Sequence, residues 1–164
     1  MLTASRLREL LRYDPETGLF TWHTRRGRIA AGSVAGVIGG EGYFVIRVDY
    51  RLHLAHRLAW LYMTGEWPQA TVDHRDTDRT NNRWTNLRDA SYGQNNANSV
   101  KPNRTGLKGI KRHGHRYVAQ ISVGGINRHL GCFSSPEEAH AAYIAAATQH
   151  FGEFARLNNA TGSP

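Results

Sequence analysis

The segment Lys101–Gly106 divides the chain into two parts whose residue patterns differ. It reads KPNRTG, and this mixture of proline, glycine, polar and charged residues is typical of a connection between domains. A chain of 164 residues is long enough for two small domains. We therefore expect a first domain over 1–100, a linker over 101–106, a second domain over 107–158 and a flexible tail over 159–164.

The first part predicts helices and small antiparallel strands separated by glycines. Leu7, Leu10 and Leu11 fall on one face of a helix predicted over 3–12. Alternating apolar and polar residues predict three short strands: 19–22, 43–48 and 51–54, with a hairpin at Asp49-Tyr50. The apolar run HRLAWLYMT over 56–64 predicts a buried helix that ends at Gly65. A strand over 71–74, a polar loop, a second strand and a helix over about 91–99 complete a predicted ββα unit, with a core at about 54–98.

The second part predicts a three-stranded antiparallel sheet packed on one helix. The strands are expected over 109–112, 116–123 and 126–133, with glycines at both turns. Ser135 and Pro136, followed by two glutamates, are typical of a helix start, and the helix is expected to run to about Phe151. The whole chain is therefore predicted to be α+β.

Positive charge gathers in a stretch that lacks acidic residues. The formal net charge is +8, yet Ala90–Pro136 contains no Asp or Glu and contains seven Lys or Arg residues and three His. A fold needs no such stretch, whereas a surface that binds a polyanion does. Most of the positive residues are arginines, which bind phosphate through two parallel hydrogen bonds. Double-stranded DNA is the expected partner.

Several other classes of protein are excluded by composition. The single cysteine, Cys132, excludes a disulfide within one chain and a cysteine-type zinc site. No run of about eighteen apolar residues indicates a membrane span, and the first residues do not resemble a secretory signal. We expect an intracellular protein, in the cytoplasm of a bacterium or a phage-infected host, without a small-molecule substrate. It is expected to be a monomer, or a dimer on DNA.

The pair Asp73-His74 is the candidate catalytic feature. Hydrolysis of a phosphodiester needs a base to activate water and a cation to neutralise developing charge. Histidine suits the first role because its unperturbed pKa lies near neutrality, and a carboxylate can bind a hard divalent cation for the second. An isolated Asp-His pair is common, so its surroundings decide the interpretation.

Those surroundings resemble the signature of the HNH endonucleases, particularly the phage and intron-encoded homing branch. The resemblance is carried by VDHRDTDRTNNRWTNLR and SYGQNNAN, with AHRLAWLYMTGEWP and LLRYDPETGLFTW upstream. It implies that His74 is the general base and that Asp73 binds one divalent metal ion, Mg²⁺ or Mn²⁺. Asn95 would complete the metal site, with Asn96 as the alternative, and Asn86 would brace the loop that orients His74.

Other polar residues near this pair are given lesser roles. Asp76 and Asp78 are expected to cap the loop, with metal binding as the alternative. Asn81 and Asn82 are expected to satisfy backbone groups of the turn. His56 is expected to be a buried, hydrogen-bonded residue, with a phosphate contact as the alternative. Three arginines are candidates for DNA phosphate contacts: Arg57, Arg75 and Arg83.

The second part, over about 104–158, resembles the APETALA/ethylene-response-factor type of DNA-binding domain. The matching features are a Gly-Ile pair, the LGCF motif at 130–133 and the Ala-Ala-Tyr run in the last helix. In that family the sheet lies in the major groove. The resemblance implies nine DNA-contacting candidates: Lys108, Lys111, Arg112, His113, Gln120, Ser122, Asn127, Arg128 and His129. His129 stands where a tryptophan is usual and Gln120 replaces an acid, so base preference does not carry over.

These observations together predict a metal-dependent, homing-type DNA endonuclease whose second domain recognises the site, cutting one strand or both. One alternative is a non-catalytic, sequence-specific DNA-binding regulator derived from such a nuclease. Retention of Asp73, His74, Asn86 and Asn95 argues against it. A nonspecific nuclease is the third interpretation, and an added DNA-reading domain argues against that.

Overall fold

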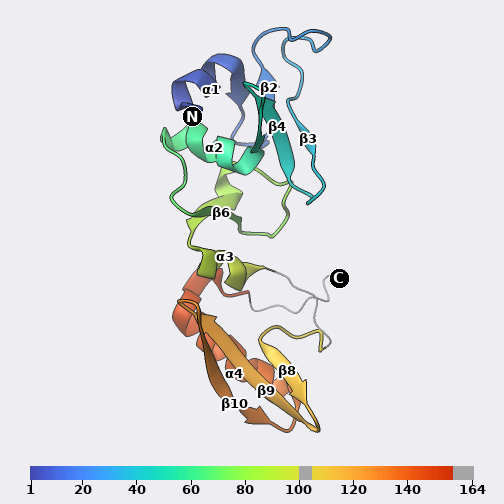
Figure 1. The fold of residues 1–164 in the computed structure, drawn as a ribbon, viewed down its shortest axis with the longest axis vertical. Helices are drawn as coiled ribbons and strands as arrows, with labels where there is room; N and C mark the ends of the chain where they lie inside the picture. The colour runs from blue at the N-terminus through green and yellow to red at the C-terminus, as the bar shows by residue number, and fades with distance from the viewer. Residues whose placement is uncertain (100–104, 157–164) are drawn as a thin grey trace. The chain divides into compact units, whose positions relative to one another are not determined.

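The computed structural model describes residues 1–99 and 105–156, which form two compact units. The first is Met1–Ala90 and the second begins at Ser91. Both contain helices and small antiparallel sheets, so the predicted α+β class is confirmed (Figure 1). The predicted domain boundary stays a prediction, because most of the linker and the tail lie outside the described residues. None of the helices in the described ranges has the length and apolar character needed to span a membrane.

The first unit contains three small antiparallel sheets and two helices. Its elements, in chain order, are α1 (Ala4–Leu10), β1 (Leu11–Tyr13), β2 (Phe20–Trp22), β3 (Val37–Ile38), β4 (Phe44–Val48), β5 (Arg51–Leu54), α2 (Ala55–Thr64), β6 (Thr71–His74), the 3₁₀ turn η1 (Trp84–Asn86) and β7 (Leu87–Ala90). Strand β1 pairs with β2, β4 lies between β3 and β5, and β6 pairs with β7. The core is formed mainly by large apolar side chains of α1, α2 and the strands.

Helix α1 is shorter than the leucine pattern predicts. It begins after Thr3, whose hydroxyl accepts a hydrogen bond from the Arg6 backbone N–H at 3.2 Å. It ends at Leu10 because Leu11 turns into β1 and pairs with Trp22. Both side chains of that pair are buried in the core. Strand pairing therefore overrides helical periodicity at this point.

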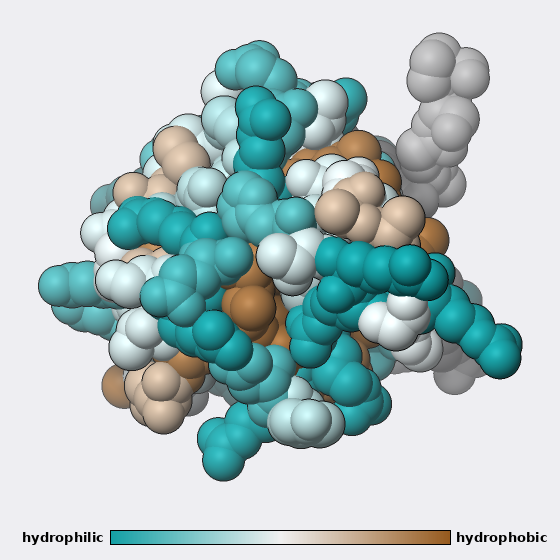
Figure 2. Space-filling view, turned by 90° about the horizontal axis from the view of Figure 1, so that it is seen from above, coloured by the Kyte–Doolittle hydropathy of each residue, from teal (hydrophilic) through white to brown (hydrophobic). Residues whose placement is uncertain are grey.

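The hairpin predicted at Asp49-Tyr50 is present. Both residues have positive φ angles, 44° and 65°, and connect β4 to β5 through a two-residue turn. Seen from above the view of Figure 1, the surface is mainly hydrophilic, with apolar residues visible in smaller areas between (Figure 2).

The second unit consists of α3 (Tyr92–Asn98), a three-stranded sheet and a long helix. Its other elements are β8 (Ile110–His113), β9 (Arg116–Val123), β10 (Ile126–Phe133), α4 (Pro136–Phe151) and the 3₁₀ turn η2 (Gly152–Phe154). Strand β9 lies between β10 and β8, and α4 covers one face of the sheet (Figure 1). Ala119 and Ile121 of β9 are buried with Ala139, Tyr143 and Ala147 of α4, as the alternation in β9 predicts.

The turn between β1 and β2 supports the loop between β6 and β7. The Tyr13 hydroxyl donates to the Asn82 carbonyl at 2.7 Å, and the Trp84 N–H donates to the Pro15 carbonyl at 3.0 Å. Gly18 has a φ of 75°, and a Cβ added there would lie 2.4 Å from the Asn82 carbonyl carbon. Only glycine fits both the positive φ angle and this close approach.

We predict that Gly18→Ala destabilises the protein more than Gly32→Ala does. Gly32 has a similar φ of 80°, but a Cβ there would have no neighbour within 4 Å. Gly32→Ala should therefore cost only the backbone strain, about 1 kcal/mol, whereas Gly18→Ala must also displace the loop backbone, for a total of about 3 kcal/mol. Urea unfolding of both variants measures the difference, and equal losses would contradict the close packing at Gly18.

Candidate functional site

The short ladder between β6 and β7 positions the Asp-His pair. Asp73 lies opposite Arg88, and His74 lies opposite Leu87. Asp73 and His74 are 3% and 5% exposed, so both faces of β6 are covered. Two buried ionisable groups next to each other require internal partners, because unpaired buried polar groups are costly.

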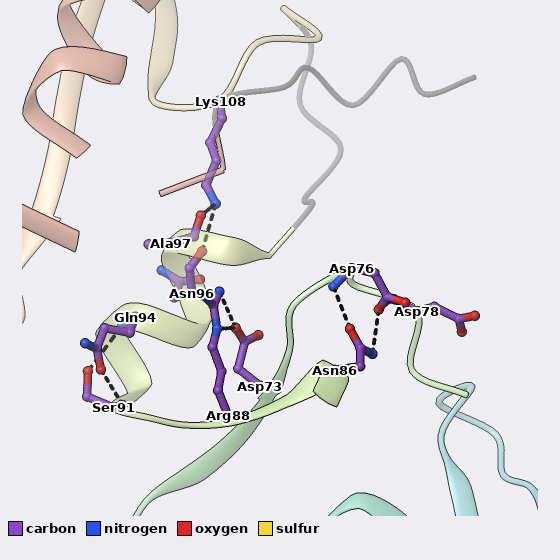
Figure 3. A network of polar contacts seen from close by, with 10 residues as sticks. All are labelled: Asp73, Asp76, Asp78, Asn86, Arg88, Ser91, Gln94, Asn96, Ala97 and Lys108. Atoms are coloured by element: carbon purple, nitrogen blue, oxygen red, sulfur yellow. Dashed lines mark hydrogen bonds and ion pairs between the residues drawn. The ribbon is translucent and has the colours of Figure 1, made fainter. Parts of the chain in front are cut away.

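Arg88 is the partner of Asp73. Its Nε and Nη2 both lie 2.8 Å from Asp73 Oδ2, and both side chains are less than 10% exposed (Figure 3). A guanidinium that binds one carboxylate oxygen through two donors holds that carboxylate in a single orientation. The structure thus places Arg88 inside the unit, beside Asp73.

Asn86 closes the loop between the two strands. Its Nδ2 donates to Asp76 Oδ1 at 2.9 Å and to the Asn81 carbonyl at 2.8 Å, and its Oδ1 accepts from the Asp76 N–H at 3.1 Å (Figure 3). The Asp76 carboxylate also accepts from the Asp78 N–H and from Asn81 Nδ2. Asp76 and Asp78 thus cap loop backbone and side-chain donors, which matches the lesser role expected for them.

Asn82 contacts the candidate base through a hydrogen bond. Its Oδ1 lies 3.1 Å from His74 Nε2, and both residues are buried. An amide oxygen can only accept, so Nε2 carries the proton and Nδ1 is the basic nitrogen of the neutral ring. Sequence reasoning gave Asn82 only a role in satisfying the turn. Its position eight residues after His74, in a loop that returns to the same ladder, was the one available signal.

The surroundings of His74 favour its neutral form. Burial lowers its pKa below the ordinary value, and this effect exceeds the opposing effects of the Asn82 hydrogen bond and the nearby carboxylates. A neutral imidazole is the protonation state that a general base needs.

His56 and Tyr43 pack around His74. The His56 ring centroid lies 4.9 Å from that of His74 at an interplanar angle of 79°, and Tyr43 lies 5.2 Å from His56 and 6.1 Å from His74. Arg79 lies over the Tyr43 ring, with its Cζ 4.8 Å from the ring centroid. His56 is buried as expected, but its Nδ1 has no hydrogen-bond partner among the described residues. Burial, followed by the charges of His74 and Arg57, lowers the pKa of His56 to about 3.

The three arginines predicted to contact phosphate differ in their surroundings. Arg57 Nη1 donates to the Ala70 carbonyl at 3.1 Å, with the guanidinium above the Trp67 ring. Arg83 is exposed, and its Nε donates to the Glu16 carbonyl at 2.8 Å. Arg75 is exposed, and its backbone N–H donates to the Asn86 carbonyl. All three belong to the first unit, as do Asp73, His74 and Asn86.

Asn95 and Asn96, the candidates for the second metal ligand, lie on α3 in the second unit. The Asn95 N–H donates to the Ser91 carbonyl, and the Asn95 carbonyl accepts from the Ser99 N–H, both at 3.0 Å. Across residues 1–99 and 105–156, three or more His, Cys, Asp or Glu side chains do not gather into a group that could hold a metal ion. One carboxylate, one amide oxygen and substrate phosphate oxygens suffice for Mg²⁺, so the predicted donor set fits the chemistry of this ion.

The DNA-contacting candidates of the second unit divide between the two faces of the sheet. Paired residues of antiparallel strands point to the same face. Ala119, paired with Ile110, faces α4, so the alternate residues face away from it. The outward-facing candidates are Lys111, His113, Gln120, Ser122, Asn127 and His129. Arg112 and Arg128 pair with Tyr117 and Ile121, in the rows that face α4. Arg116, which was not among the candidates, pairs with His113 and faces outward.

We predict that folding stability falls as the pH drops below about 6.5. The pKa of His56 is lower in the folded protein than in the unfolded chain, so the unfolded chain binds more protons between about pH 6.5 and 3. The free energy of unfolding is therefore retained above pH 6.5. Below that pH it falls by up to roughly 1.4 kcal/mol per pH unit for each such histidine. Urea unfolding from pH 7 to 4.5 measures the slope.

Two histidine variants assign this slope. His56→Phe keeps a ring beside Tyr43 and His74 but removes the titrating group, so it should reduce the slope by about one proton. His23→Phe removes an exposed histidine and serves as the control. An unchanged slope in His56→Phe would contradict the burial of a neutral His56.

Comparison with known proteins finds a family that is similar to the segment containing β6 and β7. Residues 53–97 match the family described as HNH endonuclease. The chain is also 32% identical over 123 residues to a protein of Acanthamoeba polyphaga mimivirus named uncharacterized HNH endonuclease L560. That alignment covers 74% of this chain and 65% of the relative, so the chain spans less than two thirds of the relative's length. No solved structure matches. The segment that carries Asp73, His74 and Asn86 is thus similar to HNH endonucleases, which supports a nuclease.

Proposed function

We propose that the protein is a metal-dependent, homing-type DNA endonuclease in which His74 is the general base. The observation that carries this proposal is the buried His74, oriented through Nε2 by Asn82 and adjacent in sequence to Asp73. These residues lie within the segment that is similar to HNH endonucleases. A general base and a metal ion held by an anionic ligand are together suited to the hydrolysis of a phosphodiester bond.

In the proposed reaction, His74 Nδ1 removes a proton from the water that attacks the scissile phosphate. Asn82 retains the tautomer and orientation of the ring, and Asn86 holds the loop from which Asn82 projects. Arg88 keeps the Asp73 carboxylate in place. Asp73 and Asn95 would hold one Mg²⁺ or Mn²⁺ ion, which supplies charge neutralisation at the phosphate and the leaving oxygen. Arg57, Arg75 and Arg83 remain candidates for phosphate contacts.

We further propose that the second unit recognises the DNA site through the outward face of its sheet, as its resemblance to the APETALA/ethylene-response-factor type implies. The exposed outward-facing side chains include Lys111, His113 and Arg116, and no acidic residue lies between Ala90 and Pro136. Gln120 and Asn127 offer amide groups that can hydrogen-bond base edges. Arg112 and Arg128 belong to the opposite rows and are better suited to phosphate contacts at the edges of the sheet.

The general base is tested by plasmid cleavage with Mg²⁺, Mn²⁺ or EDTA. We expect wild-type protein to cut only with metal, and His74→Ala to lose on the order of 10²- to 10⁴-fold in rate, the usual contribution of a general base. His23→Ala, at an exposed histidine remote in sequence from the pair, should cut like wild type. DNA binding without cutting under any metal would favour the non-catalytic regulator instead.

The role of Asn82 is tested by comparison with its neighbour. Asn82→Ala removes the acceptor that orients His74, so its rate should fall by roughly 10- to 100-fold, part of the full contribution of the base. Asn81→Ala removes a hydrogen bond to Asp76 but does not touch His74. A smaller loss in Asn81→Ala than in Asn82→Ala, with both variants folded, is the expected result. Equal losses would point to the loop as a whole.

The basic sheet face is tested by the salt dependence of binding to duplex DNA. The double substitution Lys111→Met and Arg116→Met removes two positively charged phosphate contacts. It should reduce the magnitude of the slope of log affinity against log salt concentration by about 2. Arg6→Met is the control for lost charge, because Arg6 in α1 is paired with Glu9 and Asp49. A salt-independent affinity in the wild type would remove the basis for the DNA-binding face.

A further inference from the structure

Helix α3 is too short and too polar to be stable by itself. It comprises seven residues, Tyr92–Asn98, with the sequence YGQNNAN. Isolated helices below about 12–15 residues are marginal in water, and this one contains a glycine and little apolar surface. Its N-terminus is closed by a capping box. Ser91 Oγ accepts from the Gln94 N–H at 3.2 Å, and Gln94 Oε1 accepts from the Ser91 N–H at 2.8 Å (Figure 3).

The C-terminus of α3 is closed by a side chain from outside the helix. Lys108 Nζ donates to the carbonyls of Asn96, Ala97 and Ser99 at 2.9, 2.5 and 2.7 Å. Figure 3 shows the lysine side chain directed at the end of the helix, with Asn96 and Ala97 as partners. The last carbonyls of a helix lack intrahelical donors, and a cation is favourable there. One ammonium group therefore satisfies the end of α3.

The backbone of Lys108 is itself held by the sheet and by α4. His140 Nδ1 donates to the Lys108 carbonyl at 3.0 Å, and the Gln120 N–H donates to the Gly109 carbonyl at 2.9 Å. A Cβ at Gly109 would lie 1.9 Å from the Tyr143 ring, so the chain passes directly against α4 at this point. The sheet and α4 thus set the position of the Lys108 ammonium group. The ammonium group in turn sets the position of α3.

We propose that Lys108 is a positioning residue, which fixes α3 and its Asn95 to the unit that reads DNA. The inference rests on the proposed function, in which Asn95 is a metal ligand. Asn95 precedes the three carbonyls that Lys108 binds, so loss of the ammonium frees the turn that follows Asn95. In this proposal Lys108 influences metal binding. Its ammonium group contacts α3, so Lys108 is not one of the DNA contacts.

The test compares Lys108→Met with Lys108→Arg. Methionine keeps an unbranched side chain but removes all three donors, whereas a guanidinium can still donate to several carbonyls. Three quantities are measured: the Mn²⁺ concentration for half-maximal plasmid cleavage, Mn²⁺ binding from the loss of the free-ion electron paramagnetic resonance signal, and metal-free affinity for duplex DNA. Lys111→Met is the reference for a lost DNA contact, and Asn95→Ala for a lost metal ligand.

We expect Lys108→Met to raise the half-activating Mn²⁺ concentration and to weaken Mn²⁺ binding, each by about tenfold or more, the range for residues that orient a metal ligand. Its cleavage rate at saturating Mn²⁺ and its DNA affinity should stay close to wild type, and Lys108→Arg should restore most of the metal response. Lys111→Met should show the opposite pattern, with weaker DNA binding and unchanged Mn²⁺ dependence.

Other results overturn the inference. If Lys108→Met weakens DNA binding like Lys111→Met and leaves the Mn²⁺ response unchanged, Lys108 is a DNA contact. A variant that only lowers the active fraction, with unchanged Mn²⁺ dependence, shows a structural role alone. If Lys108→Met does not fold, a wild-type metal response in folded Lys108→Arg supports the inference, and a response like that of Lys111→Met overturns it. Failure of the proposed function is recognised separately, by a wild type that never cuts or by an unchanged Mn²⁺ response in Asn95→Ala.

Discussion

The ion pair between Asp73 and Arg88 is the interaction on which the arrangement of the site depends. Both residues are buried, and both lie on four-residue strands whose pairing is set by few hydrogen bonds. A shift of one residue would move each side chain to the other face and leave a buried carboxylate without its guanidinium. Breaking a buried pair is much more costly than never forming it. The pair therefore specifies the register of β6 and β7, and this register places His74 beside the loop.

The loop that orients His74 draws its support from a distant part of the chain. Asn82 bonds to the imidazole, but its own carbonyl is held by Tyr13. Gly18 lets the first turn approach the same backbone. Asn86 completes the support from within the loop. An imidazole aligned in this way needs little reorganisation to accept a proton, because the groups around it are already in place. Tyr13 and Gly18 thus support the site although they supply none of its proposed chemistry.

Helix α3 carries a candidate metal ligand and belongs to the unit with the basic sheet, two features that the sequence assigned to separate domains. By sequence it completes the ββα pattern, and by its contacts it belongs to the unit of the basic sheet. In the proposed function α3 also carries Asn95, so one short helix holds both a candidate metal ligand and the contacts with Lys108.

The sequence by itself determined the element types and the three antiparallel strands of the second unit, and it supplied the candidates for the proposed catalytic site. Short-range signals suffice for the elements, namely alternation in Arg116–Val123 and the Ser135-Pro136 helix start. The candidates Asp73, His74 and Asn86 come from the resemblance of their segment to HNH endonucleases. Tertiary structure decided where α1 ends, that Arg88 pairs with Asp73, that Asn82 orients His74, and that Lys108 caps α3. The physical reason is that a buried polar group takes whichever partner the packing brings within hydrogen-bond distance. In these four cases the partner is not specified by any repeating pattern along the chain.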